Sequence, residues 1–316
     1  MRPSRFGRLP SAWPIAAMLI SGALIAGCRS DAPPPRRDST VVVAPSPPES
    51  TTTAPSSNGW LAAAGPVLLA AGPSPEEAIV FLGAGSETAA ALDTGAVDQA
   101  SATLLARDGS RFTATLELPA GNDNPACRVW PLRQLRAAGG VGTWSIGFLS
   151  DTVTGIPLDS VGALSARDSM ALAAEASRLA SAVTANTSPA FEGLRFTVQD
   201  VRRFQTAPGV QALAAQLTRR VNQEASPQEE LTFLIAERDS GVTSGPYRLA
   251  YAERSFGKEE EVSSSELVAA VRIGDGAPSL IVARDGDDGL AYSIIERIAP
   301  RQWRVRWTSG LAKCVD

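Results

Sequence analysis

The sequence contains no histidine among its 316 residues. This absence removes the Ser-His-Asp and Cys-His nucleophilic mechanisms, which need an imidazole as their general base. It also excludes zinc sites with histidine ligands and pH sensing by histidine protonation. The enzyme classes that remain open are therefore few.

Lysine is nearly as scarce, with only Lys258 and Lys313. A Ser-Lys mechanism would have to use one of them. Lys258 is followed by Glu259–Glu261, whose negative charges favour the protonated amine and make it a poor base. A hydrolase with paired carboxylates needs neither histidine nor lysine. Nothing selects such a pair from the 33 acidic residues, so no catalytic residue is predicted.

The chain also lacks an apolar run long enough to cross a bilayer as a helix. Residues 12–25 form an apolar stretch of only 14 residues with Pro14 inside it, whereas a spanning helix needs about 20. Three arginines precede this stretch: Arg2, Arg5 and Arg8. A basic leader before a short apolar core is typical of a secretory signal peptide. Residues 1–27 are predicted to be one, with an uncleaved membrane helix as an alternative.

The leader ends in Ile25-Ala26-Gly27-Cys28, which resembles the lipobox of bacterial lipoproteins. The resemblance implies cleavage before Cys28, lipid attachment to its thiol, and acylation of the new N-terminus by chains such as palmitate. Two or more acyl chains hold a protein stably on a membrane. Arg29 stands where an aspartate would favour inner-membrane retention, so the periplasmic face of the outer membrane is the expected location. Ordinary secretion without a lipid is the alternative.

Positive charge is sparse in the mature chain. Residues 1–27 hold three of the 29 basic residues and no acidic one, which leaves 26 against 33 and a net charge of −7. Such a chain lacks the basic surface expected of a nucleic-acid binder. No nucleic-acid partner is therefore predicted, and the lipid accounts for membrane association.

Cysteine is limited to Cys28, Cys127 and Cys314. With Cys28 acylated, two remain in an exported and oxidising compartment, where disulfides form and persist. A Cys127–Cys314 disulfide is predicted because it would fix a chain end that otherwise frays. Two unpaired thiols are the alternative.

A proline-rich tether precedes a long segment with strand patterns. Residues 28–58 combine proline with serine and threonine, a composition that buries too little apolar surface to fold. Residues 59–316 contain no second linker of this kind. They are predicted to form one mainly-β extracytoplasmic domain, with two lobes as the alternative.

Three segments of this domain share an apolar strand, an Asp/Gly turn and a returning strand: residues 102–118, 234–254 and 280–297. Such turns between apolar runs predict antiparallel hairpins. Residues 302–307 alternate apolar and polar side chains and predict a further strand. The fold class is therefore mainly β (α+β), with the hairpins in one large sheet or two packed sheets.

One principal helix is predicted near residues 165–185. Ser165 with Asp168 three residues later is typical of a helix start. The apolar stripe that follows comprises Leu172, Ala176, Leu179 and Val183. Such a stripe is expected to pack against a sheet.

Residues 271–297 resemble FG-GAP-like repeats, in which an apolar strand accompanies an Asp/Gly-rich calcium loop. The candidate calcium ligands are Asp285, Asp287 and Asp288. The alternating spacing of a full calcium loop is missing, and ordinary hairpin turns use the same residues. No cofactor is therefore expected apart from the lipid on Cys28.

Two further sets of residues have a structural and a functional interpretation. Glu-Arg pairs at strand ends are expected to form cross-strand ion pairs on an exposed sheet face, or else to line a charged groove for an anionic or sugar ligand. Four tryptophans are expected in the core, or else in a glycan-binding platform. The pairs are Glu237-Arg238, Glu253-Arg254 and Glu296-Arg297, and the tryptophans are Trp130, Trp144, Trp303 and Trp307.

The expected function is non-enzymatic. The sequence indicates a membrane-anchored lipoprotein whose β-rich domain binds an envelope protein or glycan, or has a structural role in the envelope. The alternative is a periplasmic hydrolase, which would show a deep cleft with two carboxylates about 5–10 Å apart.

Overall fold

The computed structural model describes residues 68–72, 74–81, 98–117, 132–149, 152–160, 164–183, 188–221, 227–239, 241 and 245–311. All of these belong to the second of two compact units of the chain, Pro47–Asp316. The predicted signal peptide, the tether, Cys28 and the Cys127–Cys314 pair lie outside the described residues. The lipid anchor and the disulfide therefore remain predictions.

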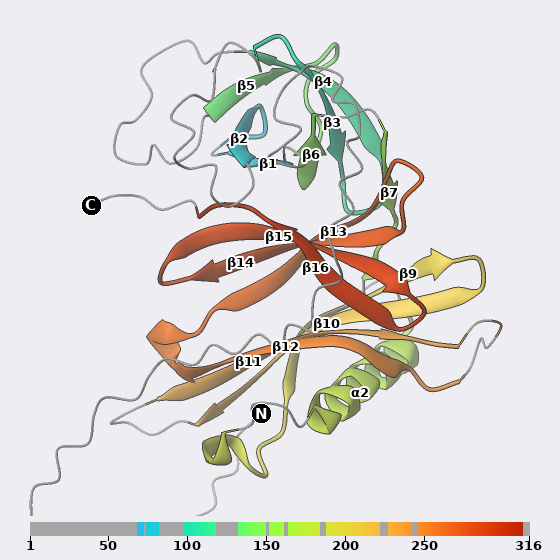
Figure 1. Ribbon diagram of the computed structural model, residues 1–316, viewed down its shortest axis with the longest axis vertical. Coiled ribbons are helices and arrows are strands. Elements are labelled where there is room, and N and C mark those ends of the chain that lie inside the picture. Colours follow the sequence, from blue (N-terminus) through green and yellow to red (C-terminus); the bar gives the residue numbers. More distant parts are fainter. Residues whose placement is uncertain are drawn as a thin grey trace, which may run out of the picture. The chain divides into compact units, whose positions relative to one another are not determined.

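The first six strands form a closed barrel in the order β1-β2-β5-β4-β3-β6 (Figure 1). They are β1 (Leu68–Ala71), β2 (Glu77–Phe81), β3 (Ser101–Leu105), β4 (Arg111–Glu117), β5 (Leu132–Arg136) and β6 (Ile146–Phe148). Buried apolar side chains such as Phe81 and Leu104 form its core. β6 pairs with both β1 and β3. Gly147 permits this close approach, because a Cβ there would lie 2.7 Å from the Leu104 side chain.

Two antiparallel meanders follow, each completed to a five-stranded sheet by a short edge strand. The helix-side sheet has the order β12-β11-β10-β9-β8, and the barrel-side sheet has the order β16-β15-β14-β13-β7. The first meander comprises β9 (Thr197–Ala207), β10 (Val210–Val221), β11 (Gln228–Glu237) and β12 (Arg248–Lys258). The second comprises β13 (Ser264–Ile273), β14 (Pro278–Gly286), β15 (Gly289–Ala299) and β16 (Gln302–Thr308).

One short segment supplies the edge strand of both sheets. β7 (Val153–Ile156) pairs with β13 of the barrel-side sheet, and β8 (Asp159–Ser160) pairs with β9 of the helix-side sheet. Leu158, between the two strands, is buried in the apolar core that the sheets share. The segment therefore passes from one sheet to the other within a few residues.

Packing arranges these elements in layers. The barrel-side sheet packs against the barrel on one face and against the helix-side sheet on the other. Neighbouring residues of β14 show this division, since Ile281 contacts the barrel core while Leu280 and Val282 contact the helix-side sheet. Successive strand residues point to opposite faces, so a sheet buried on both faces has a continuous apolar run. That explains why Leu280–Val282 shows no polar alternation.

The α-helix α2 (Ala166–Ala182) covers the outer face of the helix-side sheet. Ser165 is its N-cap, with its hydroxyl accepting a hydrogen bond from the Asp168 amide at 3.2 Å, as predicted. Leu172, Ala176 and Leu179 are buried against β9, β10 and β11. Val183 was wrongly included in the buried stripe: the helix ends one residue before it, and Ala180 is the fourth buried residue.

The prediction of a mainly-β fold with antiparallel sheets and one principal helix is confirmed. Each of the three predicted hairpins is present, as β3-β4, β11-β12 and β14-β15. Two packed sheets are present as well, and the barrel comes in addition to them. Among the described residues, no helix has the length and apolar character needed to span a membrane.

Candidate anion-binding site

The predicted calcium ligands lie at the β14–β15 hairpin. Asp285 is in β14, and Asp287 and Asp288 form the turn before β15. Within the described ranges, no group of three or more acidic, cysteine or histidine side chains is placed to hold a metal ion. The turn geometry gives no support to a calcium site here.

The described tryptophans do not form a platform. Trp144 is buried in the barrel core, with its indole N–H donating to the Pro75 carbonyl at 2.9 Å. Trp303 is buried between the two sheets, and Trp307 packs partly buried against the barrel core. The core interpretation holds for these three, while Trp130 lies outside the described residues.

Two of the three strand-end glutamates, Glu237 and Glu253, do not form the expected cross-strand ion pair on an exposed sheet face, which corrects that expectation. Glu237 and Glu253 of the helix-side sheet reach across to Arg297 and Arg284 of the barrel-side sheet, at 2.8 and 2.6 Å. Glu296 does form the expected cross-strand pair, with Arg306 at 3.0 Å. Packing of the two sheets brings strand ends from opposite sheets together. The sequence of a single hairpin does not indicate this placement.

The Glu237 carboxylate is fully satisfied. It accepts hydrogen bonds from Nε and Nη2 of Arg297 at 2.8 and 2.9 Å, from the Arg301 amide at 3.1 Å, and from the Trp303 indole at 2.6 Å. A buried charge with this many donors is a structural element of the sandwich. We call these residues the Glu237 cluster.

A different arrangement occurs on the outer face of the helix-side sheet, beyond the end of α2. Leu217 and Leu234 are buried under the helix. Because side chains two apart in a strand share a face, the same face continues past the helix with Arg219 of β10, then Thr232 and Glu230 of β11. Arg254 of β12 completes this group, which we call the Glu230 cluster.

A hollow of about 540 Å³ lies over this part of the sheet. Its walls come from the end of α2, the short helix η4 (Pro189–Phe191), and the chain that leads to β9. The lining residues are Ser181, Val183, Ser188, Pro189, Glu192, Gly193, Leu194, Phe196, Arg219 and Arg254. We call it the α2 hollow, and its volume falls in the range of roughly 300–1,000 Å³ typical of small-ligand sites.

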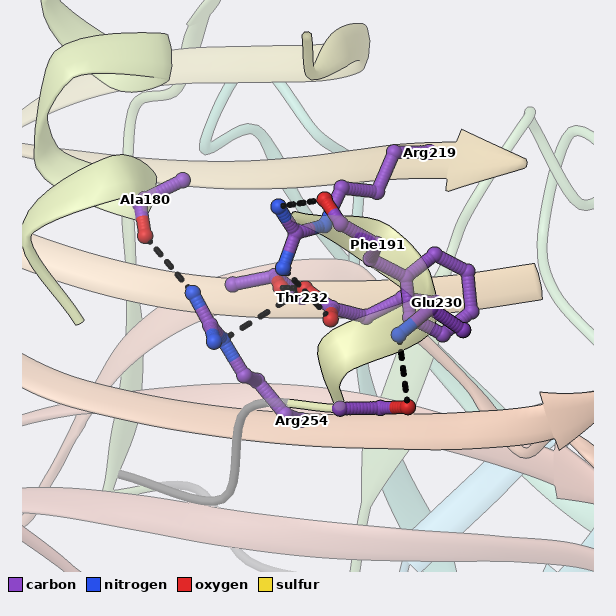
Figure 2. A network of polar contacts seen from close by, with 8 residues as sticks. Ala180, Phe191, Arg219, Glu230, Thr232 and Arg254 are labelled. Carbon is purple, nitrogen blue, oxygen red and sulfur yellow. Dashed lines mark hydrogen bonds and ion pairs between the residues drawn. The ribbon is translucent and has the colours of Figure 1, made fainter. Parts of the chain in front are cut away.

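Glu230 lies between the two arginines (Figure 2). Arg219 Nη2 donates to the carboxylate at 2.9 Å, and Arg219 Nη1 donates to the Phe191 carbonyl at 2.8 Å. Arg254 Nε lies 3.6 Å from the carboxylate, and its Nη2 donates to the Ala180 carbonyl at 2.8 Å. Thr232 adds a weaker hydroxyl bond to Glu230 at 3.4 Å. The hydrogen bond from Arg254 to the Ala180 carbonyl satisfies an acceptor near the C-terminal end of α2, where the helix dipole is negative.

Two aromatic rings hold the guanidinium groups in place. The Arg219 guanidinium carbon lies 4.6 Å from the centre of the Phe196 ring and 5.5 Å from that of Phe191. Arg254 lies 5.8 Å from the same Phe196 ring. These distances are within the range at which an aromatic face attracts a cation. The rings thus fix the orientation of both arginines beside the hollow.

The Glu230 cluster has an excess of positive charge and of donors. The Arg254 side chain is 3% exposed and that of Glu230 is 0% exposed. Arg219 and Arg254 thus share this one buried carboxylate. Arg219 Nε and both Nε and Nη1 of Arg254 are buried without a hydrogen-bond acceptor in the described part of the chain. Burial lowers the pKa of Arg254, Glu230 acts in the opposite direction, and the nearby Arg219 charge adds to the lowering. The cluster therefore combines a net positive charge with donors that have no acceptor.

A second hollow of about 520 Å³ adjoins the first and shares Leu194 and Arg219 with it. Its basic residues are in part neutralised. Arg220 contacts Glu229 at 2.7 Å, and the Thr218 hydroxyl donates to the same carboxylate oxygen at 2.7 Å. The second hollow also contains Arg195, whereas the buried nitrogens without acceptors belong to Arg219 and Arg254, which both line the α2 hollow.

Sequence reasoning identified Arg254 only as part of a strand-end pair and of a possible charged groove. It missed Arg219 and Glu230. A signal was present, since Arg219-Arg220 and Glu229-Glu230 face each other across the β10–β11 hairpin. Recognising it required the register of that hairpin, and adding Arg254 required the register of β12 as well.

Searches of protein-family models, of curated proteins and of solved structures each found no match to this chain.

Proposed function

We propose that this chain is an exported, lipid-anchored binding protein without enzymatic activity, and that its β-rich domain holds an anionic group in the α2 hollow. The observation that carries the binding role is the buried Arg254, whose charge and donors exceed what Glu230 accepts. Buried polar groups normally have partners. A ligand anion would supply the missing acceptor and offset the buried charge.

Arginine favours binding over acid–base catalysis at this site. Its guanidinium stays protonated in proteins and presents a planar fork of donors that matches oxyanions. The buried carboxylates of this sheet, Glu229, Glu230 and Glu237, are each engaged by an arginine. No observation favours the hydrolase, and it is not proposed.

The placement of the protein rests on the lipobox that ends at Cys28. Acylation there would hold the domain at the envelope, with the periplasmic face of the outer membrane favoured by Arg29. The binding partner in this setting is an envelope component or a periplasmic solute that carries an anionic group. An envelope protein or glycan with such a group remains within the proposal.

Metabolic labelling tests the anchor. Cells that express the full chain with an alkyne analogue of palmitate are expected to label it, and Cys28→Ser is expected to abolish the label. The matched control is Cys127→Ser, which removes another thiol and should keep the label. Equal labelling of the wild type and Cys28→Ser would refute lipid attachment at Cys28.

Thermal unfolding of the full chain tests anion binding. At constant ionic strength, acetate, phosphate and sulfate are compared with chloride, because an anion at free concentration L that binds only the folded state stabilises it by RT ln(1 + L/Kd) and so raises the unfolding midpoint. The rise for at least one anion should disappear in Arg254→Met. It should persist in Arg248→Met, which removes an exposed arginine from the same strand. A flat response to all anions would overturn the binding role.

A further inference from the structure

We infer that the ligand group held in the α2 hollow is a single carboxylate attached to a short apolar body. This inference rests on the proposed anion-binding function and specifies its chemistry. It follows from the net charge of the Glu230 cluster, from its donors and from the side chains that line the hollow.

Charge balance favours a monoanion. Arg219 and Arg254 carry two positive charges against the one negative charge of Glu230. One further negative charge neutralises the cluster. A dianionic phosphate would leave a net negative charge beside Glu230, and the exposed Glu192 carboxylate in the lining would repel a dianion more strongly than a monoanion. The cluster therefore suits one carboxylate better than one phosphate.

The donors suit a carboxylate as well. The two oxygens of one carboxylate can each accept a hydrogen bond from a different arginine. Arg254 uses Nη2 for the Ala180 carbonyl, and its Nη1 remains without an acceptor. Arg219 contributes its free Nε. These nitrogens are covered in the structure, so a carboxylate would reach them only after the exposed segment 192–194 moves aside.

The rest of the lining is apolar enough to receive a hydrocarbon group. Val183, Pro189, Leu194 and Phe196 line the hollow together with two serine residues. Leu194 is 39% exposed, which leaves apolar surface at the hollow that a ligand could cover. Each methylene buried against such surface gives roughly a fourfold gain in affinity. The ligand is thus an amphipathic acid, either a free small carboxylic acid or the C-terminus of a peptide with an apolar last residue.

Titration calorimetry of the full lipidated chain in a non-ionic detergent tests this inference at pH 7. The probes are sodium hexanoate, sodium acetate, hexanamide, inorganic phosphate and the dipeptide N-acetyl-Ala-Leu with a free carboxylate. Hexanoate is expected to bind at least tenfold more tightly than hexanamide or phosphate, and several-fold more tightly than acetate. Tighter binding of hexanoate would indicate a free carboxylic acid as the ligand. Tighter binding of the dipeptide would indicate the C-terminus of a peptide.

Three variants locate the site. Arg254→Met is expected to weaken hexanoate binding at least tenfold, whereas Arg248→Met on the same strand should leave it within twofold. Leu194→Ser changes a partly exposed residue and should not disturb folding. It is expected to weaken hexanoate at least threefold while leaving acetate unchanged, because only the longer acid covers Leu194.

The outcomes separate this inference from the function on which it rests. If phosphate binds more tightly than hexanoate and Arg254→Met abolishes phosphate binding, the proposed anion site is supported and the carboxylate inference is overturned. If hexanoate and hexanamide bind equally, the site is apolar and the inference fails. If no probe binds and no anion shifts the unfolding midpoint, the proposed function and the inference fail together.

Discussion

Glu230 and Glu237 are both buried glutamates of β11, one near each end of the strand, and they differ in how completely their networks close. Glu237 faces the sandwich and accepts four hydrogen bonds, which use the donors that Arg297 and Trp303 direct at it. Glu230 faces outward and is shared by two arginines that retain nitrogens without acceptors. The same residue type on one strand thus has a closed hydrogen-bond network at one end and leaves arginine donors without acceptors at the other.

The largest effect is expected from opening the closed network. Arg297→Met removes two of the four hydrogen bonds to Glu237 and leaves a buried carboxylate without its cation. Breaking a buried pair in this way typically costs about 3–5 kcal/mol. Urea unfolding should show this loss in the free energy of unfolding.

The control for that variant is Arg306→Met, which makes the same substitution in an ion pair whose arginine is 54% exposed. Exposed pairs contribute about 0–1 kcal/mol, so its loss should be small. If the two variants lost similar amounts, the Glu237 cluster would not be the structural element described above.

An intermediate effect is expected from Arg219→Met. Arg219 makes the shortest ion pair to Glu230 and also donates to the Phe191 carbonyl. Arg254 remains at 3.6 Å to balance the carboxylate, so the loss in unfolding free energy should be about 2 kcal/mol, near the lower end for buried charged hydrogen bonds. A loss equal to that of Arg297→Met would indicate that Arg254 gives Glu230 no compensation.

A smaller effect is expected from Arg254→Met, although it removes a more deeply buried arginine. The variant loses the bond to the Ala180 carbonyl, but it also removes a desolvated charge and its repulsion with Arg219. Because these changes oppose each other, the net loss in the free energy of unfolding should be about 1 kcal/mol or less. Urea unfolding and hexanoate titration on one preparation should show near-normal stability with lost binding. A stability loss above about 3 kcal/mol would make both clusters structural.

The smallest effect is expected from replacing Glu175. Its hydrogen bonds with Arg178 and the Tyr247 amide connect α2 to the residue before β12. Hydrogen bonds from Arg178 lower the pKa of Glu175 below its usual 4.5, the Tyr247 amide acts in the same direction, and burial opposes both. A lowered pKa means that the folded state favours the charged carboxylate. The stabilisation is therefore complete above about pH 4.5 and is lost as pH falls through the folded-state pKa.

Glu175→Gln should accordingly lower the unfolding free energy by about 0.5–1 kcal/mol at pH 7, since Arg178 is largely exposed. The difference from the wild type should shrink as the pH falls below about 4.5. Unfolding curves at several pH values measure it, and a difference independent of pH would exclude the ionised carboxylate as its source.

The sequence was sufficient for the local elements of this fold. The Asp/Gly turns of residues 102–118 and 280–297 bring neighbouring strands together, and Ser165 with Asp168 starts the helix, because these contacts form within a few residues. The barrel depends instead on β6 pairing with β1, about eighty residues earlier in the chain. No local periodicity encodes that closure, so it was not predicted.

The candidate site was partly accessible for the same reason. Arg254 carried a recognisable charge at a strand end, and its partner Glu230 does lie on the neighbouring strand β11, but the pair is buried instead of exposed. Its contacts with Ala180, Phe196 and Glu230 combine a helix end, a connecting segment and another strand. Each of these is a tertiary contact, which propensity and spacing do not determine.

The segment that supplies β7 and β8 has a mechanical consequence. β7 is hydrogen-bonded to β13 and β8 to β9, with Leu158 inserted into the core between the sheets. Sliding one meander over the other would break one of these pairings or expose Leu158. The β7–β8 segment therefore opposes sliding of one meander over the other.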